Sequence, residues 1–282
     1  MDLRRSMFTI ALTFAVASTI AMLGWKFFYR PEPTYKGKPL SAWAEQYGSN
    51  HWTGGTATSR AASQEAEFAV RQIGTNGIPF LLKLMRARDS ALKKKLRTIV
   101  PQTWRQTKLR LRDRSGEIRR VGAHGLAALG TNAPAAVPAL IELATNHPED
   151  DGRYIAVFAL RTLGSAAEPA IPFLIQCLTN KINIIRDDAA LGLGYMHRRP
   201  EIAVPALIQC LDLARSSKNT FECADVISSL GEFGTNAKAS VPILLGLLNH
   251  SDSYVRSRVT NSLSLIDSDA ATKVIGKINR FP

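Results

Sequence analysis

Apolar side chains recur along most of the chain at the spacing of one helical face. The pattern is counted from six reference positions, which are Gly74, Gly130, Gly164, His197, Gly234 and Asp267. Apolar residues stand one and four positions before every reference, and small or β-branched residues stand eight positions before. Because these three offsets share one side of an α-helix, each reference position ends an amphipathic helix.

A second helix follows each of these first helices. Proline stands eight positions after the reference in four copies, and Pro79 comes three residues early in the first copy. Proline is tolerated in the first turn of a helix because its missing N–H costs little there, and apolar pairs follow it in the chain. Glycine at the reference position can adopt the left-handed conformation that stops the first helix, and a short turn then leads to the proline.

The helix pairs repeat at a nearly constant period. From Gly130 onward, successive reference positions are 34, 33, 37 and 33 residues apart. One pair of short helices buries too little apolar surface alone, so consecutive pairs must stack. The sequence therefore predicts an all-α fold, a right-handed α-solenoid of about six helix pairs over residues 57–282, with no sheet after residue 55.

These helix pairs closely resemble HEAT repeats. That family has a first helix of the type Val-Arg-x-x-Ala followed by Ala-Leu-Gly, and a proline-started second helix. The Val-Arg pair is matched by Ile118-Arg119, Ile185-Arg186 and Val255-Arg256, and its arginine by Arg153. The departures are Ser63 and Cys223 at the arginine position, and His197 and Asp267 at the hinge glycine. The resemblance implies a superhelical surface that holds proteins, sometimes nucleic acids, and only rarely a catalytic site.

Basic residues are concentrated in one inserted segment. The chain has a formal net charge of +13, and residues 83–120 alone hold 14 Lys and Arg against three Asp and Glu. The spacing between the first two reference positions exceeds one period by about 22 residues in this segment. Its apolar residues recur at helical spacing: Leu92, Leu96, Ile99, Val100 and Trp104. We therefore expect a basic helical insert at about residues 88–114, broken near Pro101 and packed by this stripe beside the first repeat.

Two interpretations of the insert stay open. Its cations form a hypothetical patch for the phosphates of nucleic acid or lipid headgroups. These residues are Lys93, Lys94, Lys95, Arg97, Arg105, Lys108, Arg110 and Arg112. Alternatively, they form a solvated face that keeps an Ala- and Leu-rich domain soluble, since they are scattered around the helix and only Trp104 offers a stacking ring.

The N-terminal 30 residues have the pattern of a membrane anchor. Residues 6–25 are uncharged, and 20 helical residues span about 30 Å, the thickness of the hydrocarbon core. A cleaved signal peptide is the alternative, because Ala15-Val16-Ala17 is a small-x-small site. Basic residues flank the segment almost equally, and we place the repeats on the extracytoplasmic side as a working prediction. Residues 31–56 are predicted to link and cap the domain, with a short helix at 40–47 and packing roles for Trp43 and Trp52.

Residues that carry chemistry are sparse in this sequence. The five histidines are scattered, and no His-x-x-x-His or Cys-x-x-Cys spacing occurs. Cys177 and Cys210 occupy the same place in two copies, which is typical of small buried residues, and Cys223 makes an odd number that gives no disulfide framework. No glycine-rich phosphate loop is present. We therefore predict no catalytic, metal or cofactor site and no enzyme activity.

The predicted function is that of a membrane-tethered, non-catalytic scaffold that holds a protein or peptide in a groove. The groove would be lined by the second helices, at positions chosen by their offset from the proline. These positions are Ala139, Glu142, Phe173, Gln176, Ala206, Gln209 and Ile243. This surface is mostly neutral and partly apolar, which suits a peptide better than a phosphate backbone. The alternatives are binding of nucleic acid or anionic lipid through residues 83–120, and a non-catalytic subunit resembling HEAT-like lyase subunits.

Overall fold

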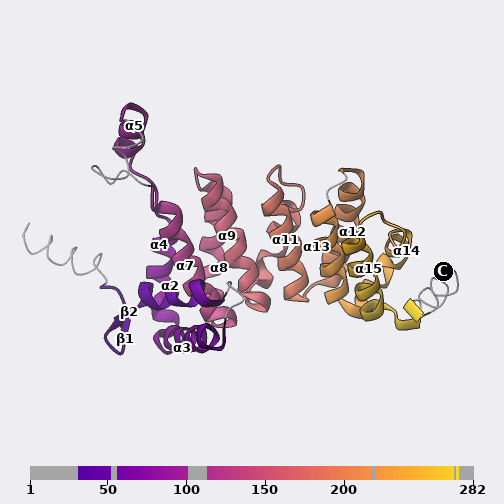
Figure 1. Ribbon diagram of the computed structural model, residues 1–282, viewed down its shortest axis with the longest axis horizontal. Helices are drawn as coiled ribbons and strands as arrows, with labels where there is room; N and C mark the ends of the chain where they lie inside the picture. Colours follow the sequence, from indigo (N-terminus) through magenta and orange to yellow (C-terminus); the bar gives the residue numbers. More distant parts are fainter. Residues whose placement is uncertain (1–30, 52–55, 101–112, 218–219, 270, 273–282) are drawn as a thin grey trace, which may run out of the picture.

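The computed structural model describes residues 31–51, 56–100, 113–217, 220–269 and 271–272. These residues form a row of helices that runs from the N-terminal to the C-terminal end of the chain (Figure 1). In chain order the helices are α2 (Leu40–His51), α3 (Ala57–Ile73), α4 (Ile78–Met85), α5 (Ala91–Ile99), α7 (Ser115–Leu129), α8 (Val137–Asn146), α9 (Asp150–Thr162), α10 (Ile171–Cys177), α11 (Asn183–Met196), α12 (Pro200–Ser217), α13 (Thr220–Glu232), α14 (Val241–Gly246) and α15 (Ser253–Ile266).

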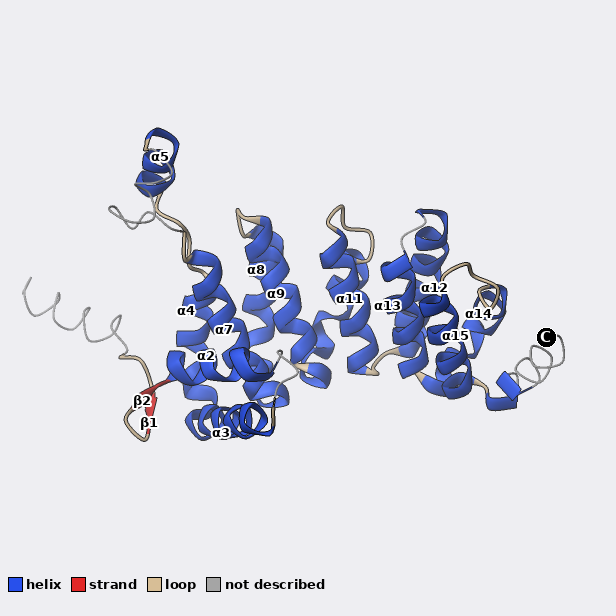
Figure 2. Ribbon diagram, in the orientation of Figure 1, coloured by secondary structure: helices blue, strands red, loops and turns tan. Residues whose placement is uncertain are grey.

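The helices form two layers. The first helices of the repeats are α3, α7, α9, α11, α13 and α15, and the proline-started helices are α4, α8, α10, α12 and α14. From α7 onward each first helix packs against the preceding proline-started helix and against the next first helix. The strands, β1 (Thr34–Tyr35) and β2 (Lys38–Pro39), form one antiparallel hairpin ahead of the repeats (Figure 2). The prediction of a helical solenoid without strands is confirmed for the described residues after 55.

The first helices end at the predicted reference positions, but the glycines there are not in the predicted left-handed conformation. Gly74 has φ +65° and ψ −151°, and Gly130 has φ +53° and ψ −129°. This combination is open mainly to glycine, because a Cβ atom would clash. His197, which replaces the glycine, has φ +50° and ψ +32° instead, and these left-handed values are the ones a side chain tolerates.

Proline starts the second helices, with one exception. Pro79, Pro138, Pro172 and Pro242 each lie in the first two positions of their helix. The prediction is wrong for Pro205, which lies inside α12 because that helix already begins at Pro200. The N–H groups of Ile202 and Ala203 both donate to the Arg199 carbonyl, so the first turn forms before Pro205 is reached.

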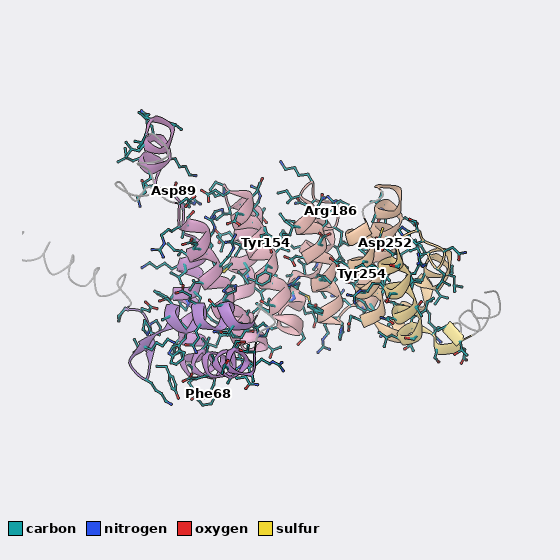
Figure 3. The ribbon with its side chains drawn as sticks, in the orientation of Figure 1. Phe68, Asp89, Tyr154, Arg186, Asp252 and Tyr254 are labelled. Atoms are coloured by element: carbon teal, nitrogen blue, oxygen red, sulfur yellow. The ribbon has the colours of Figure 1, made fainter. Side chains whose placement is uncertain are left out.

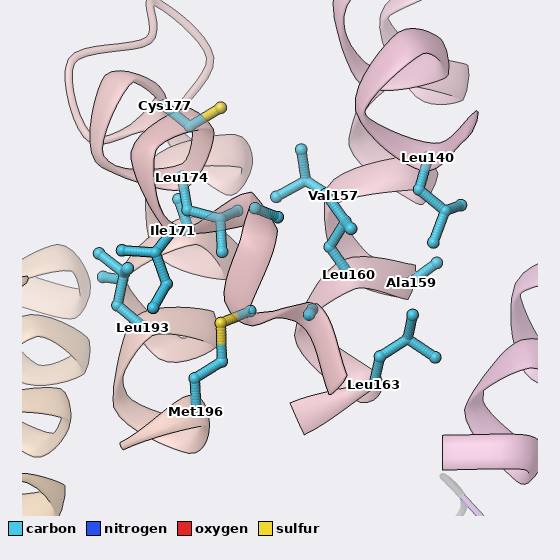
Figure 4. Close-up of a cluster of buried hydrophobic side chains, with 14 of the residues drawn as sticks. Leu140, Val157, Ala159, Leu160, Leu163, Ile171, Leu174, Cys177, Leu193 and Met196 are labelled. Carbon is cyan, nitrogen blue, oxygen red and sulfur yellow. The ribbon is translucent and has the colours of Figure 1, made fainter. Parts of the chain in front are cut away.

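The core lies between the two layers and consists of the in-phase apolar positions. Leu160 and Leu193 are fully buried at the position four before the reference, and Leu163 and Met196 are buried one before it. Leu174 of α10 packs in the same cluster (Figure 4). The core face of the first helices is therefore confirmed. Cys177 and Cys210 are buried, as predicted from their repeat-equivalent places, and Cys223 is buried as well.

The arginine of the Val-Arg pair has a structural role in the repeats. Arg153, Arg186 and Arg256 each donate an Nη1 hydrogen bond to the carbonyl six residues earlier, at distances of 3.0, 2.7 and 2.6 Å. Those carbonyls belong to the loop before each first helix. Because a guanidinium is a fixed multiple donor, one side chain holds the loop against its own helix. Arg119 makes the equivalent bond to Ala87, at 2.8 Å.

The segment before the repeats forms a cap rather than a loose linker. The predicted short helix is confirmed and extends to His51, and α2 packs against both α3 and α7. Trp43 is buried and donates its indole N–H to the Tyr35 carbonyl at 3.2 Å, so its predicted packing role is confirmed. Trp52 lies outside the described residues.

The basic insert departs from its prediction. The helix α5 forms, but its apolar stripe does not pack on the first repeat: Leu92 is 66% exposed and Ile99 is 71% exposed. In the described part of the chain α5 makes no extensive contact with another helix, and it stands apart from the two layers (Figure 1). Residues 86–90 connect it to α4.

No described helix is long and apolar enough to cross a membrane. The predicted anchor at residues 1–30 lies outside the described residues, and so does most of the predicted second helix of the sixth pair, from residue 273 onward.

Candidate protein-binding surface

The two layers are not equally close-packed. Successive first helices have extensive contacts with one another, whereas contacts between successive proline-started helices are sparse. Gly194 and Gly231 occupy the same repeat position, and a Cβ atom there would lie 2.9 Å from Cα of Ser229 and 2.6 Å from Oγ of Ser262. The first helices therefore form the closer-packed of the two layers.

Aromatic and charged side chains gather on the solvent side of two neighbouring first helices. Tyr154, Phe158 and Arg161 come from α9, and Asp188 and Tyr195 from α11. The Arg161 guanidinium lies 5.1 Å from the Phe158 ring centroid and 5.9 Å from that of Tyr195, and it donates an Nη1 hydrogen bond to Asp188. We call these five residues the Arg161 cluster. Figure 3 shows Tyr154 on α9 and, farther along the same layer, Tyr254 on α15.

The ion pair between Arg161 and Asp188 is largely buried, with the two side chains 15% and 6% exposed. Burial raises the pKa of Asp188 to about 6, although the Arg161 guanidinium lowers it, and Asp187 and Asp225 also raise it. Among the described residues, neither Oδ2 of Asp188 nor Nε of Arg161 has a hydrogen-bond partner. The single ion pair thus offsets only part of the free-energy cost of removing the two charged groups from water.

Two cavities adjoin the Arg161 cluster, both under the capping helix α2. One has a volume of about 370 Å³ and lies between Tyr47 and His51 of α2 and Arg161 and Tyr195 of the repeats. The other, of about 260 Å³, is lined by His124, Tyr154 and Phe158. A Cβ atom at Gly48 would lie 1.8 Å from Nδ1 of His124, so glycine lets α2 approach the first-helix layer at this point.

The predicted groove residues lie in the other layer. Ala139, Phe173, Ala206 and Ile243 are half-buried and pack on the core, whereas Glu142, Gln176 and Gln209 are exposed. Their helices have few contacts with one another, apart from those between α10 and α12. Whether this layer binds a partner stays a prediction. The Arg161 cluster was missed because the reasoning from sequence followed only the solvent side of the proline-started helices.

The predicted anion patch is described only in part. Lys93, Lys94 and Lys95 lie exposed on α5. Nζ of Lys94 is 2.7 Å from Oε1 of Glu149, at the start of α9. Arg97 belongs to α5, but its side chain is not described, and four members of the patch lie outside the described residues: Arg105, Lys108, Arg110 and Arg112.

Groups of three or more His, Cys, Asp or Glu placed to hold a metal ion are absent from the described residues. The Cys177 thiol is a poor nucleophile, because burial raises its pKa to about 11. Burial lowers the pKa of His124 to about 4, and Arg120 lowers it further, so this ring is neutral near pH 7. The geometry of these groups favours packing over chemistry.

Comparison with known proteins identifies the repeats. The family model described as HEAT repeats matches residues 137–220, which span α8 to α12. Residues 137–220 are therefore HEAT repeats within a helical solenoid. The copies on either side of the matched stretch have the same helix order and the same buried positions. No curated protein matches the chain.

Several solved structures are similar to this chain at low sequence identity. The karyopherin Kap121p, in a structure bound to the SUMO protease Ulp1p, is 13% identical and aligns over 86% of this chain and 26% of its own, with a TM-score of 0.52. An engineered protein is 18% identical over 80% of this chain and 96% of its own, with a TM-score of 0.45. A designed armadillo repeat protein in complex with the peptide (KR)4 is 14% identical over 81% and 99%, with a TM-score of 0.43. At such identities the likeness concerns the fold alone.

Proposed function

We propose that the protein is a non-catalytic scaffold that binds a protein or peptide on its first-helix layer, at the Arg161 cluster. The observation that supports this most directly is Tyr195, a residue that is 51% exposed and that lies, like the half-buried Phe158, beside the Arg161 guanidinium. Aromatic and arginine side chains are the residues most enriched in the energetic centres of protein interfaces. By analogy, the karyopherin with this fold holds a protein in its solved structure.

The cluster has the parts of an anchor site for a protruding side chain. The two adjoining cavities give concave space next to flat aromatic surface. Packing against Phe158 and bonding to Asp188 hold Arg161 in place, so little side-chain entropy remains to be lost on binding. Its guanidinium side chain is 15% exposed and can donate a further hydrogen bond to a carboxylate or carbonyl oxygen of a partner. The surface therefore favours a peptide segment that carries an apolar side chain beside an acceptor group.

A photo-crosslinking amino acid placed in the full chain tests the choice of layer. One chain carries it at Tyr195, a second at Gln176 on the predicted groove, and a third at Ser251 in an exposed loop as control. We expect a discrete crosslinked partner from position 195 and none from the other two. Crosslinking from position 176 alone would show that the partner binds the predicted groove of the proline-started helices and not the first-helix layer.

Two double variants test independently which of the two helix layers binds the partner. Phe158→Asp with Tyr195→Ala should abolish the crosslink and the binding of the isolated partner. Phe173→Asp with Gln209→Lys places charge on the other layer and should leave binding unchanged, because charge is costly only where an interface buries it. Thermal unfolding of both variants checks that loss of binding is not loss of fold.

The tether belongs to the same proposal and rests on sequence. Residues 6–25 would anchor the chain, with the repeats on the extracytoplasmic side. Carbonate extraction of membranes from cells that make the full chain tests the anchor, and protease added to intact cells tests the side. Release of the protein by carbonate would show that residues 6–25 are not a membrane anchor. Protection of the repeats from protease in intact cells would show that they do not lie on the extracytoplasmic side.

A further inference from the structure

The helix α5 presents an apolar stripe that no described residue covers. Leu92, Leu96 and Ile99 are 66%, 36% and 71% exposed. They lie four and three residues apart, which places them on one side of the helix. The repeats bury nearly all of their in-phase apolar side chains, so this stripe contrasts with the rest of the fold.

The stripe points away from the solenoid. At about 100° per residue, Leu92, Leu96 and Ile99 fall within an arc of about 60°, and Lys94 lies about 170° from the centre of that arc. Nζ of Lys94 contacts Glu149 of α9. Since Lys94 faces the repeats, the opposite side of α5, with the apolar stripe, faces outward. Figure 1 shows α5 beyond the ends of α4 and α7, at the N-terminal end of the solenoid.

Positive charge borders the stripe on both sides. On the same helical geometry Lys93 and Lys95 flank the apolar arc, at about 90° and about 70° from its centre. Both are exposed, and α5 contains four basic and no acidic residues. Lysines in such positions can keep the ammonium group at a polar surface while the stem covers apolar atoms.

We propose that α5 is a membrane-contact helix that lies flat on an anionic phospholipid surface, with Leu92, Leu96 and Ile99 in the acyl boundary and Lys93 and Lys95 among the headgroup phosphates. A helix with an apolar face and a lysine-rich border is the form that binds this interface. Because Lys94 holds the opposite side on Glu149, the solenoid stays in water when the stripe is immersed.

The apolar stripe decides between lipid and nucleic acid, which share the phosphate chemistry. A nucleic-acid backbone would pair with the lysines but leave Leu92 and Ile99 in water. A bilayer satisfies both kinds of side chain at once. The inference does not depend on the proposed protein-binding function, because it concerns another element and another ligand.

The test uses the full chain reconstituted in vesicles, with an environment-sensitive fluorophore on one introduced cysteine. Cys177, Cys210 and Cys223 are buried, so labelling goes to the new thiol. In Ile99→Cys the label sits in the stripe, and in Thr98→Cys it sits off the stripe, toward the solenoid. We expect a blue shift and quenching by doxyl lipids for the label at 99, only in vesicles that contain phosphatidylglycerol. The label at 98 should stay in water.

Removing lysine charges from α5 measures how much they contribute to membrane binding. Each lysine near an anionic surface contributes about 1 kcal/mol, a factor of about five, so Lys93→Gln with Lys95→Gln should lower the ratio of inserted to free α5 by roughly 25-fold. A matched variant removes two exposed cations elsewhere, by Lys181→Gln with Lys238→Gln, and should change the ratio less than about twofold. The predicted anchor is present in every chain, so it cancels from the comparison.

Three results would overturn the proposal. One is an equal shift in phosphatidylcholine vesicles, another an equal shift for the labels at 98 and 99, and the third an unchanged ratio after charge removal. Retention of duplex DNA that is unaffected by Leu92→Gln with Ile99→Gln, together with no shift in vesicles, would assign α5 to nucleic acid instead. Circular dichroism of each variant confirms that the solenoid is intact.

Discussion

Two titrating groups, Asp188 and His124, should change the stability of the protein with pH in opposite directions. Asp188 has its pKa raised from 3.8 to about 6, chiefly by burial. The native state therefore binds its proton more tightly than the unfolded chain does. The stability this group contributes is complete below about pH 4 and is lost as the pH rises through about 6.

His124 acts in the opposite direction. Its pKa is lowered from 6.5 to about 4 by burial against α2, with smaller effects from Arg120 and His51. Here the native state disfavours the protonated ring. The stability it contributes is complete above about pH 6.5 and is lost as the pH falls toward 4.

Substitution separates the two effects. A pKa difference of one corresponds to about 1.4 kcal/mol, so the Asp188 effect amounts to about 3 kcal/mol and the His124 effect to at most about 3 kcal/mol, less the screening of a partly exposed ring. Relative to wild type, Asp188→Asn should gain about 3 kcal/mol of unfolding free energy between pH 4 and 7. His124→Gln should lose up to the same amount over that range.

Urea unfolding at pH 4, 5, 6 and 7 measures these differences, and comparison with wild type cancels all other titrating groups. The slope of each difference matters more than its value at one pH, because each substitution also changes packing. A flat difference for Asp188→Asn would show that Arg161 holds Asp188 charged at low pH. The burial argument would then be wrong for this pair.

The remaining predictions concern packing and can be checked by chemical denaturation. Leu160→Ala should cost about 2–5 kcal/mol because the side chain is fully buried, whereas exposed Gln176→Ala should cost under about 0.5; equal losses would contradict the assignment of the core face. Gly48→Ala drives a methyl group into His124 and should cost about 1–3 kcal/mol, with faster hydrogen exchange in α2; unchanged exchange would refute the close contact. Arg186→Met removes the bond to the Asn180 carbonyl and should cost about 1–3 kcal/mol, and a loss no larger than that of Gln176→Ala would show that the loop needs no clamp.

Periodic positions could be predicted from sequence because each copy repeats the same packing problem. The offsets that identified Leu160 and Leu193 as core residues reflect one helical face that every neighbour must cover. The ends of the first helices were also predictable, since glycine marks most of them. The exact backbone there was not, because sequence shows that a positive φ is needed but not which ψ the following turn requires.

The binding surface and the insert could not be predicted in the same way. The exposed positions of the first helices carry no periodic signal, so Tyr154 and Tyr195 read as ordinary surface residues until α9 and α11 are seen side by side. The stripe of α5 was misjudged for a related reason. An apolar face at helical spacing shows that something will cover it, but spacing alone does not say whether the cover is the same chain.

The Arg161 cluster and the apolar stripe of α5 both consist of residues that do not occupy the in-phase apolar positions of the repeat. An apolar residue in phase with the period, such as Leu160, always meets the next copy, and its energy stabilises the fold. Tyr195 is out of phase and the Leu92 stripe is inserted, so both stay exposed, although Arg161 of the preceding copy lies beside the Tyr195 ring. Their burial energy remains available to a ligand. Substitutions at in-phase positions should therefore lower stability with binding intact in the folded fraction, and substitutions at Tyr195 or Leu92 should lower binding with stability intact.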